Sequence, residues 1–149
     1  MDSRQSFTAE FHRRDSSMDP EHILDTEAEV TALVTEDMCP AWDGVVVHRV
    51  YSTWSMAHHM ELACRKLLMP HLADDEEALG GHLSIEHVSP LPVGGTVRAT
   101  AHCVEADRKS VVCEVTSRDH VTGRLLGRGR QVQKIMKLKT LKSLIERYQ

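Results

Sequence analysis

One stretch in the middle of the chain constrains the fold more than any other, because its apolar residues recur with the period of an α-helix. From Thr53 to about His71, one helical face collects the apolar side chains: Met56, Ala57, Met60, Ala63, Cys64, Leu67 and Leu68. The other face carries polar ones: His58, His59, Arg65 and Lys66. Ser52 and Thr53 can each cap the first turn with a side-chain oxygen. We therefore predict a long amphipathic helix that packs against an apolar surface.

After this helix the apolar period changes to two, which is typical of half-buried β-strands. An acidic run, Asp74 to Glu77, is predicted to be a solvated loop before Gly80-Gly81. In the strand that follows, one face carries Leu83, Ile85 and His87. Four other segments alternate in the same way: 26–36, 96–105, 110–119 and about 124–137.

Two segments lack the strand period. Pro40 and Asp43-Gly44 indicate a loop over residues 37–51, with room for a short helical turn. The last residues of the chain are predicted to form a second amphipathic helix, whose apolar stripe consists of Leu138, Leu141, Leu144 and Ile145. This stripe packs either on the domain itself or on a partner.

One helix followed by strands without intervening helices predicts an antiparallel sheet, and its apolar face needs a cover. The long helix is the only predicted element that is large enough. We therefore predict an α+β fold of the hotdog type, in which an antiparallel sheet wraps around one long central helix. A doubly wound fold is disfavoured, because parallel strands need crossover helices. Residues 1–22 are expected to form a flexible polar tail, and residues 23–149 one hotdog domain with the C-terminal helix.

The composition argues against several classes of function. A net charge of −4 and a pI near 6.2 leave no basic field that would attract nucleic acid. No apolar stretch approaches the roughly 20 residues that span a bilayer, so no membrane association is expected. The 4 cysteines form no Cys-x-x-Cys pair and are expected to be buried free thiols of a cytoplasmic protein. The neighbours His58 and His59 diverge on a helix, so neither a metal nor a cofactor is expected.

Three polar residues stand out against the apolar pattern: Thr53, Glu61 and His87. Each alone has a structural explanation, respectively a helix cap, an ion pair with Arg65 and a hydrogen-bonded core histidine. Their joint presence is more informative, because a helix packed on the sheet can bring a hydroxyl, a carboxylate and an imidazole into one pocket. Gly80-Gly81 either forms a turn or lets a ligand approach the backbone closely.

Two segments resemble a known family, the single-domain hotdog acyl-CoA thioesterases that include the fluoroacetyl-CoA thioesterase. They are VYSTWSMAHHMELAC at the helix and ALGGHLSIEHVSPLPVGGTV at the next strand, and the similarity runs from about residue 29 to 136. By this resemblance Thr53, Glu61 and His87 match the catalytic trio, and Gly80 matches an active-site glycine. The sequence departs from the family at Trp54, after the threonine, and in RGRQVQKIM, where relatives often carry a histidine in GxHxR.

The resemblance implies a thioesterase that hydrolyses an acyl-CoA with a small or medium acyl group. Glu61 would act as nucleophile or general base, His87 would move the proton and Thr53 would position them. Substrate binding is assigned to the remaining candidates: Gly80, Gly81, Trp54, Arg128 and Arg130, with Lys109 as a further cation. The resemblance also implies a homodimer with both active sites at the interface.

Two other functions use the same fold. One is a non-catalytic module that binds an acyl-CoA or a small ligand, in which the trio is structural and Trp54 narrows the pocket. The other is a hotdog hydratase or dehydratase, although no additional Asp-His pair on one helix supports it.

Overall fold

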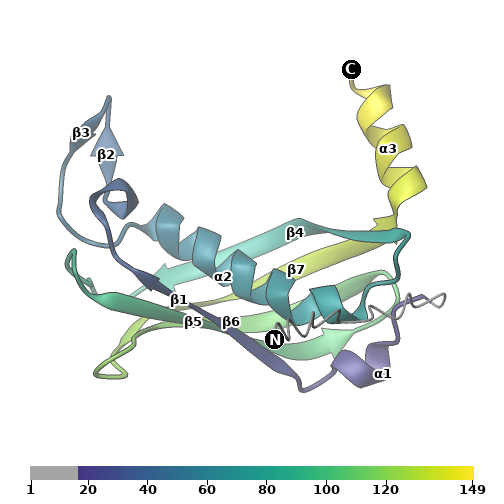
Figure 1. Cartoon of the computed structure of the whole chain (residues 1–149), viewed down its shortest axis with the longest axis horizontal. Helices are drawn as coiled ribbons and strands as arrows, with labels where there is room; N and C mark the ends of the chain where they lie inside the picture. The colour runs from purple at the N-terminus through teal and green to yellow at the C-terminus, as the bar shows by residue number, and fades with distance from the viewer. Residues whose placement is uncertain (1–16) are drawn as a thin grey trace, which may run out of the picture.

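The computed structural model describes residues 17–149 and shows an antiparallel sheet with one long helix across it (Figure 1). Helix α2 spans Thr53–Leu68. The strands of the sheet are β1 (Glu27–Leu33), β4 (Glu76–His87), β5 (Thr96–Ala106), β6 (Ser110–Asp119) and β7 (Leu125–Lys137). They lie in the order β1-β5-β6-β7-β4, and every neighbouring pair is antiparallel. The predicted α+β arrangement, a sheet around one central helix, is confirmed.

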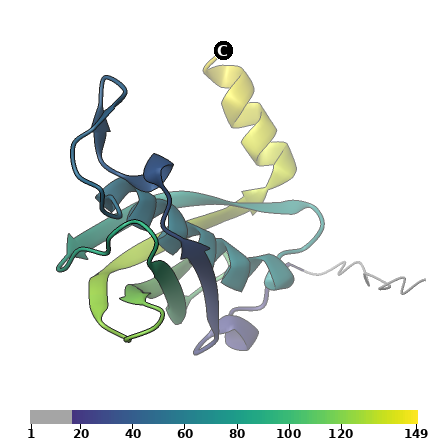
Figure 2. The same cartoon turned by 60° about the vertical axis from the view of Figure 1, so that its left-hand side comes forward.

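Shorter elements complete the described part of the chain: α1 (Pro20–Ile23), η1 (Glu36–Met38), β2 (Ala41–Trp42), β3 (Val45–Val46), η2 (Met69–His71) and α3 (Leu138–Arg147). Strands β2 and β3 form a small hairpin inside the segment that the sequence predicts as a loop. This hairpin and α3 rise past strand β4 at its two opposite ends (Figures 1 and 2). None of the helices in residues 17–149 is long and apolar enough to cross a membrane.

The core lies between α2 and the sheet, mainly under β1, β5 and β6. The helix buries the apolar face that the sequence predicts, and the strands contribute small and β-branched residues such as Val97, Ala99 and Val115. Strand β7 meets the helix at Gly127, where an added Cβ would collide with the sulfur of Met56. A glycine is therefore needed there for α2 to approach β7. All four cysteines are free and buried, as predicted.

A β-bulge divides strand β4 into two parts. The register with β7 shifts between Gly80 and His82, so Gly81 has no partner in the ladder. Because side chains alternate along a strand, one extra residue exchanges the faces of all that follow. Ala78 and Gly80 face α2 before the bulge, whereas Leu83, Ile85 and His87 face it afterwards. The bulge thus places His87 on the helix side of the sheet.

Strand β4 begins at Glu76, five positions before the predicted start at Gly81, and the reason is a buried carboxylate. Glu76 Oε1 accepts hydrogen bonds from the backbone amides of Met18 (3.0 Å) and Ala73 (2.9 Å). These two donors satisfy the carboxylate, so it leaves the solvent although the sequence places it in an acidic surface run. Met18 is itself buried, so the described end of the predicted tail packs on the core. The rest of that prediction lies outside the described residues.

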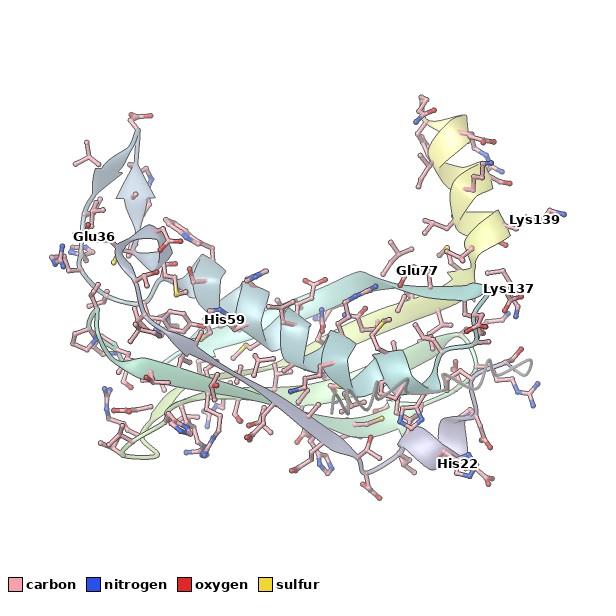
Figure 3. The ribbon with its side chains drawn as sticks, in the orientation of Figure 1. His22, Glu36, His59, Glu77, Lys137 and Lys139 are labelled. Carbon is pink, nitrogen blue, oxygen red and sulfur yellow. The ribbon has the colours of Figure 1, made fainter. Side chains whose placement is uncertain are left out.

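Histidine 59 is the clearest departure from the predicted polar face of the helix. Its side chain, labelled in Figure 3, is buried. It stacks on Tyr51 and has its Nδ1 2.5 Å from the Tyr51 hydroxyl. The same hydroxyl lies 3.2 Å from the carbonyl of Ser55. Burial, together with the charge of His58, lowers the pKa of His59, and burial raises the pKa of Tyr51. The helical wheel missed this contact because the chain before α2 folds over the polar face.

Candidate active site

Helix α2 presents one row of side chains to strand β4. The helix and the strand run in opposite directions, so the start of α2 lies beside the end of β4. Thr53 meets His87, Glu61 meets Gly80, and Arg65 reaches the backbone carbonyl of Ala78. These helix positions recur at multiples of four residues, which is the spacing of one face. The row places each predicted catalytic residue on the side of α2 that faces β4 or on β4 itself.

The first contact in the row joins Thr53 and His87. The Thr53 hydroxyl oxygen lies 2.9 Å from Nδ1 of His87, and the histidine tautomer decides which atom donates the proton. Thr53 is free for this contact because Ser52 is the helix cap: its hydroxyl accepts the amide of Ser55 at 3.1 Å. The structural explanation of Thr53 as the cap is therefore wrong. The hydroxyl orients the imidazole, and the side chain of Thr53 is exposed to solvent.

The second contact joins Glu61 and Gly80. A Cβ built on Gly80 would lie 2.8 Å from Oε1 of Glu61 and 3.7 Å from Nε2 of Gln131. The carboxylate thus rests against bare backbone, and any other residue at position 80 would push it away. Glu61 shares a small pocket of about 210 Å³ with Gly80, His82, Leu83 and Gln131. Arg65 binds Glu77 at 2.9 Å, so the predicted structural pairing of Glu61 with Arg65 is not formed.

The two contacts lie at different points along α2. Glu61 follows Thr53 by eight positions, and at 1.5 Å per residue the two Cα atoms are about 12 Å apart along the helix axis. Each pair is formed within one chain, but a single chain does not bring Glu61 to His87 at hydrogen-bond distance. The site consists of a hydroxyl–imidazole pair and a carboxylate–glycine pair on the same helix face.

A sequence model of the fluoroacetyl-CoA-specific thioesterases matches residues 34–139, a range that contains both pairs. The chain belongs to this family. It is therefore a thioesterase, an enzyme that hydrolyses thioesters. A search of curated proteins finds no match.

Solved structures with the same fold include a thioesterase superfamily member, the fluoroacetyl-CoA thioesterase and a hot-dog-like protein. A thioesterase superfamily member from Thermus thermophilus is 31% identical to the chain, with a TM-score of 0.79, and the match covers 84% of this chain and 91% of that protein. The fluoroacetyl-CoA thioesterase is 20% identical with a TM-score of 0.76, over 85% and 96% of the two chains. A hot-dog-like protein from Thermanaerovibrio acidaminovorans is 16% identical with a TM-score of 0.76, over 87% and 96%. The predicted hotdog fold is thus confirmed for this thioesterase.

Gln131 lines the pocket beside Glu61 and Gly80 but was not among the predicted candidates. It lies on β7 and is 1% exposed, and its carbonyl oxygen has no hydrogen-bond partner within the described part of the chain. Buried amide oxygens are usually paired, so this one is available to a ligand or a water. Alternation with Gln133 and Ile135 on the helix-facing side of β7 is the sequence signal that identifies it.

The other predicted binding residues lie either near the Thr53–His87 and Glu61–Gly80 contacts or on the opposite face of the sheet. Trp54 is 48% exposed beside Thr53 and packs edge-on against Trp42 of the hairpin, with ring centroids 5.8 Å apart. Gly81 is the unpaired residue of the bulge, and a Cβ there would lie 3.0 Å from Cγ of Lys134. The aromatic pair is therefore the part of this set that borders the Thr53–His87 contact.

Arg128 and Arg130 lie on the sheet face that points away from α2, because they pair in register with Glu86 and Ser84. Arg128 Nε binds Glu86 Oε2 at 3.1 Å, and Arg130 forms an ion pair with Glu105. Both arginines line an open hollow of about 500 Å³ on this outer face. Their assignment to substrate binding stays a prediction, and within one chain they are separated from Thr53 and Glu61 by the sheet.

Proposed function

We propose that this thioesterase hydrolyses an acyl-CoA with a small or medium acyl group where α2 packs against β4. The observation that carries the proposal is the 2.9 Å contact between Thr53 Oγ1 and His87 Nδ1, on the same side of α2 as the Glu61 carboxylate. Variants of the related fluoroacetyl-CoA thioesterase have been solved with acetyl-CoA and with fluoroacetate and CoA. These complexes support a CoA thioester as the substrate here.

The residues divide the reaction between them. Glu61 attacks the thioester carbonyl carbon or removes a proton from the attacking water. The carbon–sulfur bond then breaks, and the CoA thiolate receives its proton from the imidazole of His87. Thr53 holds that imidazole in one orientation, and Gly80 leaves room for the acyl carbonyl beside the carboxylate. If Glu61 is the nucleophile, the acyl group is first held on it as a mixed anhydride, which water then hydrolyses. In both cases the products are a carboxylic acid and CoA with a free thiol.

The roughly 12 Å between the two pairs makes a second copy part of the proposal. Strand β4 is an edge strand, and its outer edge has no partner strand among the described residues. An unpaired edge is a template for strand pairing, and a twofold axis there would pair β4 with β4 in antiparallel fashion. In such a homodimer, the Glu61 of one copy approaches the Thr53–His87 pair of the other. Each of the two sites then combines residues from both copies.

Mixed variants test both the reaction and the composite site. Glu61→Ala and His87→Ala are each expected to lose most thioesterase activity on a panel of acyl-CoAs, measured as released thiol. Glu29→Ala and His22→Ala, at exposed positions outside α2 and β4, are the matched controls. When the two inactive variants are mixed and allowed to exchange subunits, heterodimers should regain activity, because one of their two sites is intact.

Three outcomes would contradict the proposal. Full activity of both Glu61→Ala and His87→Ala would show that neither side chain takes part in the reaction. Inactive mixtures with proven subunit exchange show that each site lies within one chain. Tight binding of acyl-CoA without turnover by the wild-type protein would instead identify a binding module.

A further inference from the structure

The C-terminal helix α3 has an apolar stripe that no element within residues 17–149 covers. Leu138, Ile145 and the following Tyr148 are 44%, 51% and 84% exposed, and no residue of α3 is buried. The helix is anchored at its base, where the amide of Leu138 donates to the carbonyl of Asp75 at 2.8 Å. A helix of 10 residues is marginal in water without tertiary packing. Its stripe, which borders a shallow groove of about 340 Å³, therefore requires a covering surface.

The β2–β3 hairpin carries a second apolar surface of the same kind. Trp42, Val45 and Val47 are 61%, 67% and 49% exposed, and Val46 and Trp54 extend the patch at 39% and 48%. The aromatic end of this patch lies directly beside Thr53. An exposed cluster of this size on a small domain indicates an interaction surface, since scattered single residues would need no explanation.

The positions of these two arms suggest that each covers the other across a dimer. They rise on the same side of the molecule from opposite ends of strand β4 (Figures 1 and 2). An antiparallel β4–β4 pairing places the start of one strand beside the end of its partner. The α3 of one copy, which stands at the start of β4, then comes beside the hairpin of the other, which stands at the end. Within one chain the arms remain apart (Figure 3 labels Lys139 on one side and Glu36 on the other).

The charges of the two arms are complementary. Helix α3 carries Lys139, Lys142 and Arg147 against a single acidic residue, Glu146. The segment 35–49, which contains the hairpin, carries three acidic residues, Glu36, Asp37 and Asp43, against one arginine, Arg49, which forms an ion pair with Glu36. Opposite charges on facing surfaces favour the correct pairing and disfavour α3 against α3.

We infer that α3 of one copy packs on the β2–β3 hairpin of the second copy and roofs the Thr53–His87 end of that copy's active site. This inference rests on the homodimer of the proposed function. The second copy thereby supplies the apolar wall that Trp42 and Trp54 begin, so the acyl-CoA enters a site whose outer side belongs to the partner.

Cysteine cross-linking tests the contact directly. One preparation carries Val46→Cys and another carries Ile145→Cys, and the native cysteines do not interfere because they are buried. After subunit exchange and mild oxidation, the mixture should give a disulfide-linked dimer on a denaturing gel. Ser143→Cys replaces Ile145→Cys as the matched control, since residue 143 lies on the opposite side of α3. This control should give little or no cross-linked dimer.

The chain contains only 2 tryptophans, Trp42 and Trp54, so their fluorescence reports on the same contact. The double variant Leu141→Ser/Ile145→Ser should shift tryptophan emission to the red and raise the dimer dissociation constant about tenfold or more. Sedimentation separates the two possible failures. A wild-type monomer would overturn the homodimer together with this inference. A stable, active dimer without the 46–145 cross-link, and with unchanged emission in the double variant, would overturn only the position of α3.

Discussion

The substitution Gly80→Ala separates the catalytic geometry from the stability of the fold. The added methyl group would lie 2.8 Å from Oε1 of Glu61, whereas ordinary contacts begin at 3.4 Å, so the carboxylate must retreat by about 0.6 Å. Glu61 is exposed and ends a flexible side chain, which lets it move at small cost. Alanine also restricts the unfolded chain, which contributes about 0.4–1 kcal/mol in favour of the folded state. The free energy of unfolding should therefore change by less than about 1 kcal/mol.

Activity should respond much more strongly than stability. Displacement of a reacting group by about 1 Å costs up to about a hundredfold in rate. We therefore expect kcat of Gly80→Ala to fall about tenfold to a hundredfold, which corresponds to about 1.4–2.7 kcal/mol in activation free energy. Urea unfolding measures the free energy of unfolding, and thiol release from acyl-CoA measures kcat.

A double-mutant cycle identifies the cause of the loss. If the methyl group acts through the carboxylate, Gly80→Ala should have no further effect on the residual rate of Glu61→Ala. Ser84→Ala, on the outward face of the same strand, is the control for general disturbance of β4. Undiminished activity of Gly80→Ala, or an equal loss with and without Glu61, would refute the assigned contact.

Four other predictions follow from the same structure. Gln131→Leu removes a buried unpaired carbonyl, so the free energy of unfolding should rise by up to about 1 kcal/mol while kcat falls, and a loss of both would contradict this role. Because the pKa of His59 is lowered in the folded state, stability should be full above its ordinary value near 6.5 and should decline as the pH falls below it. Urea midpoints at pH 7.5 and 5.5 measure this decline, which His59→Gln should reduce. Tyr51→Phe removes the hydroxyl that contacts His59, so it should lower the free energy of unfolding by about 1–2 kcal/mol in urea. Tyr148→Phe, at an exposed position, should leave that free energy unchanged. Arg128→Ala should raise KM for acyl-CoA but leave an acyl-pantetheine substrate unaffected if this arginine binds the CoA phosphates; equal effects on both would remove that assignment.

The elements of the fold could largely be predicted because their signals are local. The helix begins at Thr53 as its capping sequence indicates, and β6 occupies the predicted residues 110–119. The start of strand β4 could not be predicted as well, since it depends on the amide of Met18, which binds Glu76. Met18 is remote in sequence from the acidic run that contains Glu76. The burial of His59 was missed for the same reason: its partner, Tyr51, lies outside the helix whose periodicity was read.

The sequence by itself determined the alternation of apolar residues and, through the resemblance, which side chains are the candidates for catalysis. Periodicity and short motifs depend on neighbours along the chain, so they survive without coordinates. Only the tertiary structure decided that Thr53 contacts His87 and that Glu61 rests on Gly80, because a bulge in β4 reverses the strand's faces. It also decided that these pairs lie at separate points along α2. Distances between elements depend on packing and register, which no local pattern in the sequence encodes.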